Sequence, residues 1–243
     1  SISVGNNFGL AWADISTGKF LCTEVSTGDL LDEVSRIQPA EVILPEYHSD
    51  EVELYSKVQK IYQQLTQLDI AVSFRMPWAF DSQGGHRMLC EQFKVKTLES
   101  YGVDEMPDVL AACAGLLDFL HSTQKSSVGQ LCDLTLHFSH EHLFLDEATR
   151  RTLEIVRNQQ DGSKQGTLLS TVDRTVTAMG ARKLREWILE PLVSNQVIES
   201  RLDAVEELLI NTSVCQDITN SLTGIADMER LAAKLVGGRS GPR

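Results

Sequence analysis

Two carboxylates in the first fifty residues stand where a metal-dependent hydrolase would place them. Asp14 ends the apolar run FGLAWAD, and Glu46 follows the apolar run EVILP. A two-metal site needs several carboxylates that converge on a pair of ions about 4 Å apart, so Asp14 and Glu46 are candidates for two of its ligands. Asp14 also precedes the turn residues Ser16, Thr17 and Gly18. An aspartate in that position accepts hydrogen bonds from the turn backbone, and we favour this hairpin role over catalysis.

Histidines form the next group with chemical potential. His137, His140 and His142 lie in the segment LHFSHEHLFLD. On a strand, His140 and His142 share one face, and imidazole is a common ligand of zinc and nickel. The main expectation is that the chain has no metal site. His140 and His142 are the alternative candidates for one, and a solvated turn at SHEH would leave all three histidines in water.

Phosphate chemistry has little support in the sequence. The stretch STGK contains Gly18 and Lys19, but the phosphate-loop pattern G-x-x-x-x-G-K-[ST] is absent. The nucleophile pattern G-x-S-x-G is absent as well. The basic run GARKLREW holds Arg182, Lys183 and Arg185, which are candidates for contacts with a DNA backbone or else the solvated face of a helix. We therefore expect no catalytic residue and no bound cofactor in this chain.

Composition narrows the classes of partner. The 243 residues carry a net charge of −12, whereas nucleic-acid-binding domains are usually basic. The five cysteines are widely spaced and form no C-x-x-C pair, which favours a reducing, cytoplasmic location. No apolar run is long enough to cross a membrane, so we expect no membrane partner. The chain opens on Ser1 and closes on GGRSGPR, which reads as a fragment of a longer protein.

The first hundred residues alternate strand and helix patterns. FGLAWAD and KFLCTEV predict an antiparallel hairpin. GDLLDEVSRIQ and SDEVELYSKVQKIYQQL have apolar residues at helical spacing, EVILPE and IAVSF predict strands, and Asp81 can begin a helix that ends at Phe93. Strands separated by helices predict an α/β domain with a mixed, mostly parallel sheet.

The second half is predicted to be mainly α-helical. Met106 to Ser122 is rich in Ala and Leu, and TVTAMGARKLREWILEP has an apolar stripe that includes Leu184 and Trp187. We expect Trp187 in a core, where truncation to Ala costs about 3 kcal/mol or more. The boundary is predicted between Ser100 and Pro107, which gives domains 1–103 and 104–243.

Spaced motifs in the second half carry a family resemblance. The pattern Leu-Asp-x-x-Thr-x-x-x-Leu-Glu begins at Leu145, a Thr-x-x-Gly-x-Arg-x-Leu-x-x-Trp pattern begins at Thr177 and is followed by Pro191 and Leu192, and Asp-x-Glu-Arg begins at Asp227. This segment resembles the core domain of the bacterial MutS family, whose members recognise DNA mismatches. ADISTGKF resembles the opening hairpin of the family's connector domain, which has a ribonuclease H-like fold.

The resemblance implies a division of labour. Full-length family members are homodimeric ATPases that use ATP and Mg on mismatched duplex DNA, and their connector docks MutL. Neither the Phe-x-Glu wedge that reads the mismatch nor a phosphate loop occurs here. The resemblance therefore implies a non-enzymatic central fragment that links mismatch binding to the ATPase. The alternative is an autonomous ribonuclease H-like, metal-dependent nuclease with a helical appendage.

A docking surface is predicted on the helix from Asp81 to Phe93. Arg87 and Glu91 lie four residues apart on one side of it, and Gly84 and Gly85 weaken its own helical propensity. A loosely specified helix suits a surface that adapts to a partner. A peripheral helix that only covers the sheet is the alternative.

Overall fold

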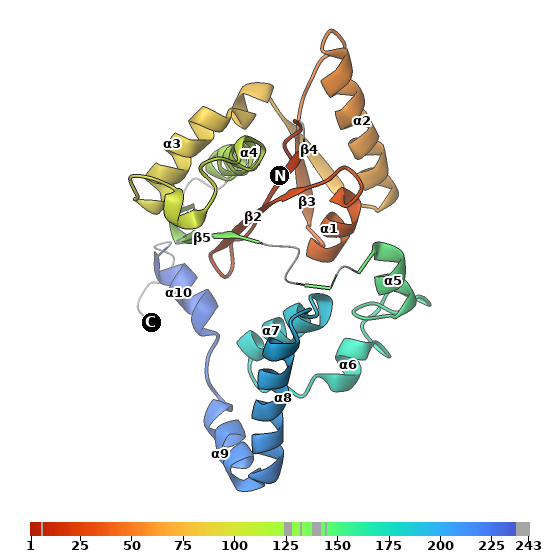
Figure 1. The fold of residues 1–243 in the computed structure, drawn as a ribbon, viewed down its shortest axis with the longest axis vertical. Coiled ribbons are helices and arrows are strands. Elements are labelled where there is room, and N and C mark those ends of the chain that lie inside the picture. Colours follow the sequence, from red (N-terminus) through yellow and green to blue (C-terminus); the bar gives the residue numbers. More distant parts are fainter. Residues whose placement is uncertain (6, 124–127, 132, 138–141, 144, 237–243) are drawn as a thin grey trace. The chain divides into compact units, whose positions relative to one another are not determined.

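The computed structural model describes residues 1–5, 7–123, 128–131, 133–137, 142–143 and 145–236. The chain divides into two compact units. Unit 1 comprises Ser1–His137 with Ala232–Arg243, and unit 2 comprises Phe138–Leu231. Figure 1 labels the elements of both units.

Unit 1 contains two small sheets. Strands β1 (Phe8–Asp14) and β2 (Lys19–Val25) form the predicted antiparallel hairpin, and β5 (Asp133–Leu136) pairs in parallel with β2. Strands β3 (Glu41–Pro45) and β4 (Ala71–Arg75) form a separate parallel pair. The mixed α/β class is confirmed, but the single sheet expected from the sequence is divided in two.

The N-terminal residues join these sheets through backbone hydrogen bonds. Ile2 forms an antiparallel bridge with Leu10 of β1, and the Ile2 N–H donates to the Ile43 carbonyl of β3 at 3.0 Å. The extended segment therefore continues the hydrogen bonding from β1 to β3 without itself being long enough to count as a strand.

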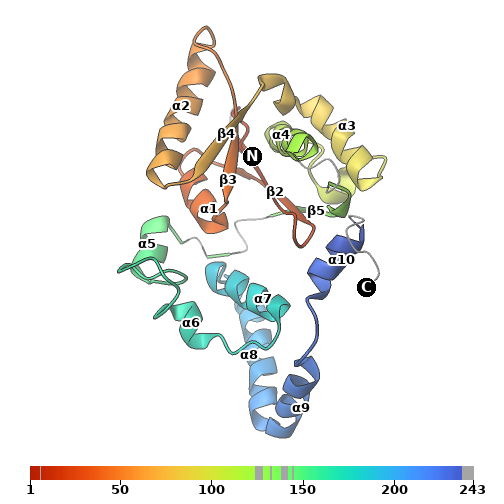
Figure 2. The same cartoon turned by 180° about the vertical axis from the view of Figure 1, so that it is seen from behind.

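Helices lie on both sides of these strands (Figures 1 and 2). Helices α1 and α2 lie on one side, and α3 and α4 lie on the other. Short 3₁₀ turns lie between β4 and α3 (η1), between α3 and α4 (η2) and between α4 and β5 (η3). The bounds of these elements are α1 Leu30–Ile37, α2 Val52–Gln67, η1 Pro77–Phe80, α3 Ser82–Phe93, η2 Glu99–Tyr101, α4 Pro107–Thr123 and η3 Val128–Gln130.

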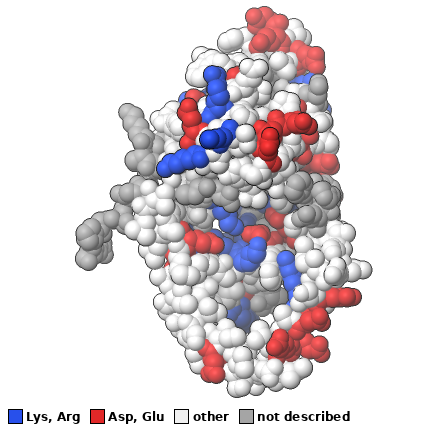
Figure 3. Space-filling model, turned by 60° about the vertical axis from the view of Figure 1, so that its left-hand side comes forward, with Lys and Arg blue, Asp and Glu red and all other residues white. Residues whose placement is uncertain are grey.

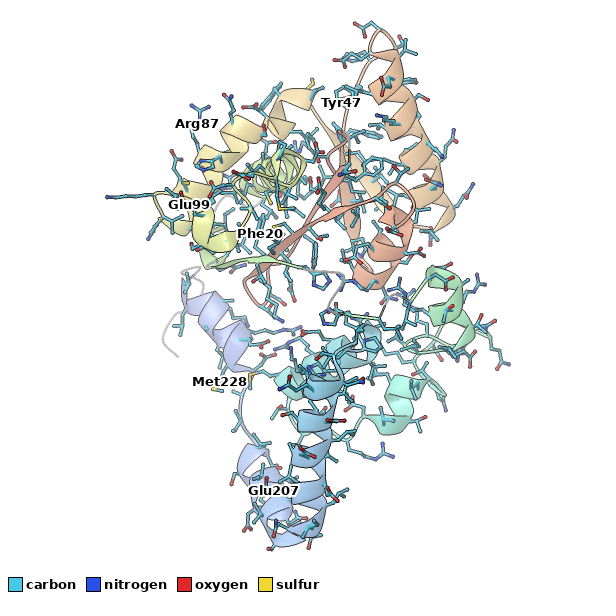
Figure 4. The ribbon with its side chains drawn as sticks, viewed as in Figure 1. Phe20, Tyr47, Arg87, Glu99, Glu207 and Met228 are labelled. Atoms are coloured by element: carbon cyan, nitrogen blue, oxygen red, sulfur yellow. The ribbon has the colours of Figure 1, made fainter. Side chains whose placement is uncertain are left out.

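Each side of the strands has its own buried core. Alternate residues of β3 divide between them, because successive side chains of a strand point to opposite faces. Val42 and Leu44 join the cluster with α1 and α2, and Ile43 joins the cluster with α3 and α4. Phe20 of β2 and Leu117 of α4 are fully buried in the cluster with α3 and α4. Phe20 is labelled in Figure 4.

Unit 1 includes helix α4 and therefore ends later in the chain than the sequence predicted. The expected boundary near residue 103 would put α4 in the second domain, but the structure puts it in the core of unit 1. Its segment VLAACAGLL is apolar around the whole helix, and such a helix is stable only when buried on all sides. The first unit therefore extends to His137.

Unit 2 is mainly helical, as predicted. Side chains at the starts of three helices accept backbone hydrogen bonds: Asp146 from Thr149, Thr167 from Ser170, and Thr177 from Gly180. Such caps satisfy N–H groups that have no partner within the helix. The helices are α5 Glu147–Thr152, α6 Leu168–Val172, α7 Ala178–Leu189, α8 Asn195–Ile210 and α9 Thr212–Leu222, and α10 (Met228–Val236) begins in unit 2 and ends in unit 1.

Few apolar side chains of unit 2 are buried. Helices α8 and α9 contain no buried residue. The expected core position of Trp187 is wrong: its side chain is 42% exposed, and the Arg201 guanidinium lies 4.0 Å from the ring centroid. The apolar stripe does lie on one helix face, but the described residues cover it only in part: Leu184 and Ile188 are half-buried and Trp187 is exposed. No helix in the described part of the chain is long and apolar enough to span a bilayer.

Candidate functional site

Asp14 belongs to the hairpin turn. Its Oδ1 atom accepts hydrogen bonds from the Ser16 N–H at 2.8 Å and the Ser16 hydroxyl at 2.7 Å. Partial burial acts to raise the pKa of Asp14, but the hydrogen bonds from Ser16 and Thr17 outweigh it and lower the pKa. Neither Asp14 nor Glu46 takes part in a cluster of three metal-ligating side chains within the described residues. This geometry supports the turn role of Asp14.

The histidines of this segment are divided between the two units of the chain. His137 lies in unit 1, where its ring meets Trp12 edge-on and its Nε2 is 3.9 Å from a carboxylate oxygen of Glu33. His142 lies in unit 2, where its Nε2 is 3.9 Å from Glu190. His140 falls outside the described residues, so the expected pair His140 and His142 stays a prediction.

The basic run on α7 is held by carboxylates. Arg182 donates two hydrogen bonds of 2.7 Å to Asp227 and two more to Glu229. These bonds raise the pKa of Arg182 and lower the pKa of Asp227 to about 2. Lys183 pairs with Glu186. The arrangement fastens α7 to the start of α10 within unit 2.

Arg185 lies in a more enclosed environment. Burial lowers its pKa, and the nearby charge of Arg157 acts in the same direction. Figure 3 shows Lys and Arg interspersed with Asp and Glu on the face it presents. A DNA contact by Arg182, Lys183 or Arg185 would therefore have to compete with existing interactions.

Helix α3 combines a fixed inner face with an exposed outer face. Asp81 accepts a hydrogen bond from the Gly84 N–H at 2.7 Å, which confirms the predicted start of the helix. Gly85 is buried against α4, and a Cβ added there would lie 2.5 Å from the Leu110 carbonyl oxygen. Its role is close packing, which corrects the idea of a loosely specified helix.

The outer face of α3 carries the two residues predicted for docking. Arg87 and Glu91 are both exposed, and Figure 4 shows Arg87 pointing away from the body of the unit. Neither side chain is used in packing α3 against α4. The face is accessible, as docking would require, while docking itself stays a prediction.

Sequence reasoning missed a pocket beside α3. His86 and Asp104 line it together, and their Nε2 and Oδ1 atoms are 2.9 Å apart. The spacing of His86 and Cys90, one helical turn apart, was the available local signal. Asp104 lies in the following loop, so its approach to His86 depends on the packing of α3 against α4.

Comparison with known proteins assigns both halves of the chain to domains of one family. The family model "MutS domain II" matches residues 1–132, and "MutS domain III" matches residues 148–243. No ATPase domain is among these matches.

Bacterial proteins named "DNA mismatch repair protein MutS" are similar over nearly the whole chain. The protein from Thermosynechococcus vestitus is 39% identical over 246 residues, which cover 98% of this chain and 28% of that protein. The protein from Salinibacter ruber is 32% identical, over 98% of this chain and 25% of its own length. The chain thus spans between a quarter and a third of these relatives. Because the domain II match alone covers more than half of the chain, the chain belongs to the MutS family of DNA mismatch repair proteins.

Proposed function

We propose that this chain is the central link of a MutS protein, which carries a partner-docking unit and a transmitting helical unit. The observation that carries the proposal is the match of two successive MutS domains to residues 1–132 and 148–243, which follow the two structural units apart from Ala232–Arg243, which belongs to unit 1. In the full-length protein, we propose, mismatched duplex DNA is bound by a homodimer and ATP with Mg is used by a domain outside this chain. We also propose the cytoplasmic location that the cysteine pattern favours.

The first unit, we infer, has the ribonuclease H-like fold of a connector domain. An antiparallel hairpin comes first, a third strand pairs in parallel beside it, and helices cover both faces. These features support the assignment. The unit would serve as a scaffold, since Asp14 is committed to its turn by the hydrogen bonds from Ser16.

Docking of MutL is proposed on the outer face of α3. Gly85 lets α3 approach the backbone of α4 closely, so the helix is held in place while Arg87 and Glu91 remain exposed. A rigid helix with accessible charges can orient a partner with little loss of conformational entropy. The presented surface is therefore preorganised.

The docking proposal is tested by Arg87→Glu in the full-length protein. We expect recruitment of MutL to weaken by about tenfold, because a charge reversal turns an attraction into a repulsion. Lys96→Glu is the matched control, since Lys96 is also exposed but follows the end of α3. Folding and mismatch binding should be unchanged in both variants, and equal recruitment by Arg87→Glu and wild type would remove α3 from the interface.

The helical unit is proposed to be completed by other parts of the full-length protein. Leu202, Leu209 and Ile210 of α8 are exposed by 61%, 70% and 74%. Contiguous exposed apolar surface of this kind marks an interface. The proposed DNA-backbone role of Arg182, Lys183 and Arg185 is secondary, because Arg182 and Lys183 already have carboxylate partners.

A further inference from the structure

The pocket beside α3 has an acidic, polar lining and an apolar wall. It is an open hollow of about 380 Å³ between the first turns of α3 and the loop that precedes α4. Ser82, Gln83 and His86 line it from α3, and Asp104 and Glu105 line it from the loop. The side chains that complete it are Pro107 and Leu110 of α4.

A chain of contacts runs from Cys90 to Asp104 beside the pocket. The Cys90 sulfur is 3.8 Å from Nδ1 of His86, and Nε2 of His86 is 2.9 Å from Oδ1 of Asp104. This order resembles a nucleophile, base and orienting acid. The thiol is unsuited to that role, because burial and the charge of Asp104 raise the pKa of Cys90 and keep it protonated. The contacts instead fix the position of the His86 ring and, through it, Asp104.

Asp104 retains an unused hydrogen-bonding atom. Its Oδ1 faces His86, whereas its Oδ2 is buried and has no hydrogen-bond partner among the described residues. A buried acceptor without a donor is unfavourable. The Asp104 side chain as a whole is 26% exposed, so a ligand in the pocket can still reach the residue.

No Lys or Arg of the described residues neutralises this site. Neither Asp104 nor Glu105 forms an ion pair with such a residue in the described part of the chain, and the side chain that contacts Asp104 is His86. Two carboxylates beside Pro107 and Leu110 suit a ligand that has a positive charge at the end of an aliphatic stem.

We propose that this pocket receives the arginine or lysine side chain of a protein that docks on α3. The ammonium or guanidinium group is held by the carboxylates of Asp104 and Glu105, and its stem lies against Pro107 and Leu110. The identity of the docking protein rests on the proposed function above, but the chemistry of the pocket does not. The pocket and the exposed face of α3 are contiguous, since Gln83 lines the pocket and Arg87 lies four residues later on the same side of the helix.

The direct experiment titrates the 243-residue chain with N-acetyl-arginine amide and follows the ring resonances of His86 by NMR. We expect a saturable shift with a midpoint in the millimolar range. Asp104→Asn should weaken binding by about tenfold, because it removes the charge while its amide oxygen can still accept a hydrogen bond from His86. Glu99→Gln is the matched control: Glu99, labelled in Figure 4, is exposed and does not line the pocket.

Two results would overturn cation binding: no saturable shift with wild type, or the same midpoint with wild type and Asp104→Asn. N-acetyl-glutamate amide should give no saturable shift, and a response equal to that of the arginine probe would also overturn the proposal. Unfolding midpoints of the two variants, measured in urea, establish that both remain folded before the titrations are compared.

A second arm separates the pocket from the docking function. In the full-length protein, Asp104→Asn should lower MutL recruitment and Glu99→Gln should not. If Arg87→Glu lowers recruitment but Asp104→Asn does not, the pocket's assigned occupant is wrong and docking on α3 stands. If the arginine probe binds but neither Arg87→Glu nor Asp104→Asn changes MutL recruitment, docking of MutL on α3 is wrong. The side chain that occupies the pocket then does not come from MutL.

Discussion

Helices α4 and α8 are nearly equal in length but belong to very different surroundings. α4 has 17 residues and α8 has 16, and both contain several leucines. Ten residues of α4 are buried, including Val109 and Leu117, whereas no residue of α8 is buried. The comparison shows that unit 1 builds its own core, while unit 2 presents apolar faces that its described residues do not cover.

From this difference we infer that the two units are stabilised by different interactions. Burial of apolar surface is the main favourable contribution to folding, so unit 1 should be stable by itself. Unit 2 gains little of it, since the buried hydrophobic residues of its described part are Ile155 and Leu189. Its stability should therefore depend more on helix caps, ion pairs and contacts made in the full-length protein.

The largest expected effect contrasts two leucines. Leu117→Ala in unit 1 should lower the free energy of unfolding by about 2–5 kcal/mol, because Leu117 is fully buried. Leu209→Ala in unit 2 should change it by less than about 0.5 kcal/mol, because Leu209 is 70% exposed. Tryptophan fluorescence during urea unfolding reports unit 2 through Trp187 when Trp12 and Trp78 are replaced by Phe, and unit 1 when Trp187 is replaced by Phe. Similar losses of unfolding free energy in Leu117→Ala and Leu209→Ala would contradict the difference in burial between the two units.

A second prediction sharpens the account of α3. Gly85→Ala should destabilise unit 1 by about 1–2 kcal/mol, although Ala is the better helix former, since its Cβ would meet the Leu110 carbonyl oxygen at 2.5 Å. Gly129→Ala is the control, because a Cβ there meets nothing within 4 Å. A stabilised Gly85→Ala variant would mean that α3 is loosely packed after all.

The third prediction concerns the ion pairs of unit 2. Arg182→Gln should lower the stability reported by Trp187 by about 1 kcal/mol, because Arg182 holds two carboxylates in a network. Lys183→Gln should cost only about a few tenths of a kcal/mol, since the pair of Lys183 with Glu186 joins residues three apart on one exposed face. Equal losses would show that the network adds nothing beyond an ordinary surface pair.

The smallest effect should appear at acidic pH. Asp227 has a pKa of about 2 in the folded chain, below its ordinary value of 3.8. The stabilisation from this carboxylate is therefore complete above about pH 4 and is lost as the pH falls toward 2. The urea midpoint reported by Trp187 should fall over this range, and the fall should be shallower in Arg182→Gln. An equally steep fall in that variant would assign the acid sensitivity to other carboxylates.

Local patterns predicted local structure well. The hairpin around Asp14, the cap at Asp81 and the helix that ends at Phe93 each depend on residues within a few positions of one another. The hydrogen bonds from Ser16 to Asp14 and from Gly84 to Asp81 follow from turn and cap chemistry alone. For that reason the sequence was sufficient to favour a turn over a catalytic acid at Asp14.

Features that depend on distant contacts were predicted poorly. Arg182 was read as a solvated or phosphate-binding residue, but its partner Asp227 lies 45 positions away. Helix α4 was assigned to the wrong side of the domain boundary, because an apolar helix does not reveal which sheet it packs against. The stripe with Trp187 showed that a face is apolar, not that it is covered. The pocket depends on Asp104 meeting His86 across 18 positions.

Hydrogen exchange of the isolated chain tests the contrast between the units most directly. Backbone amides of α4 should exchange at least ~1000-fold more slowly than those of α8, because opening α4 requires unfolding the core of unit 1 whereas α8 can open locally. In the full-length protein the amides of α8 should become markedly slower and those of α4 should change little. Equal protection of α4 and α8 in the isolated chain would contradict the account.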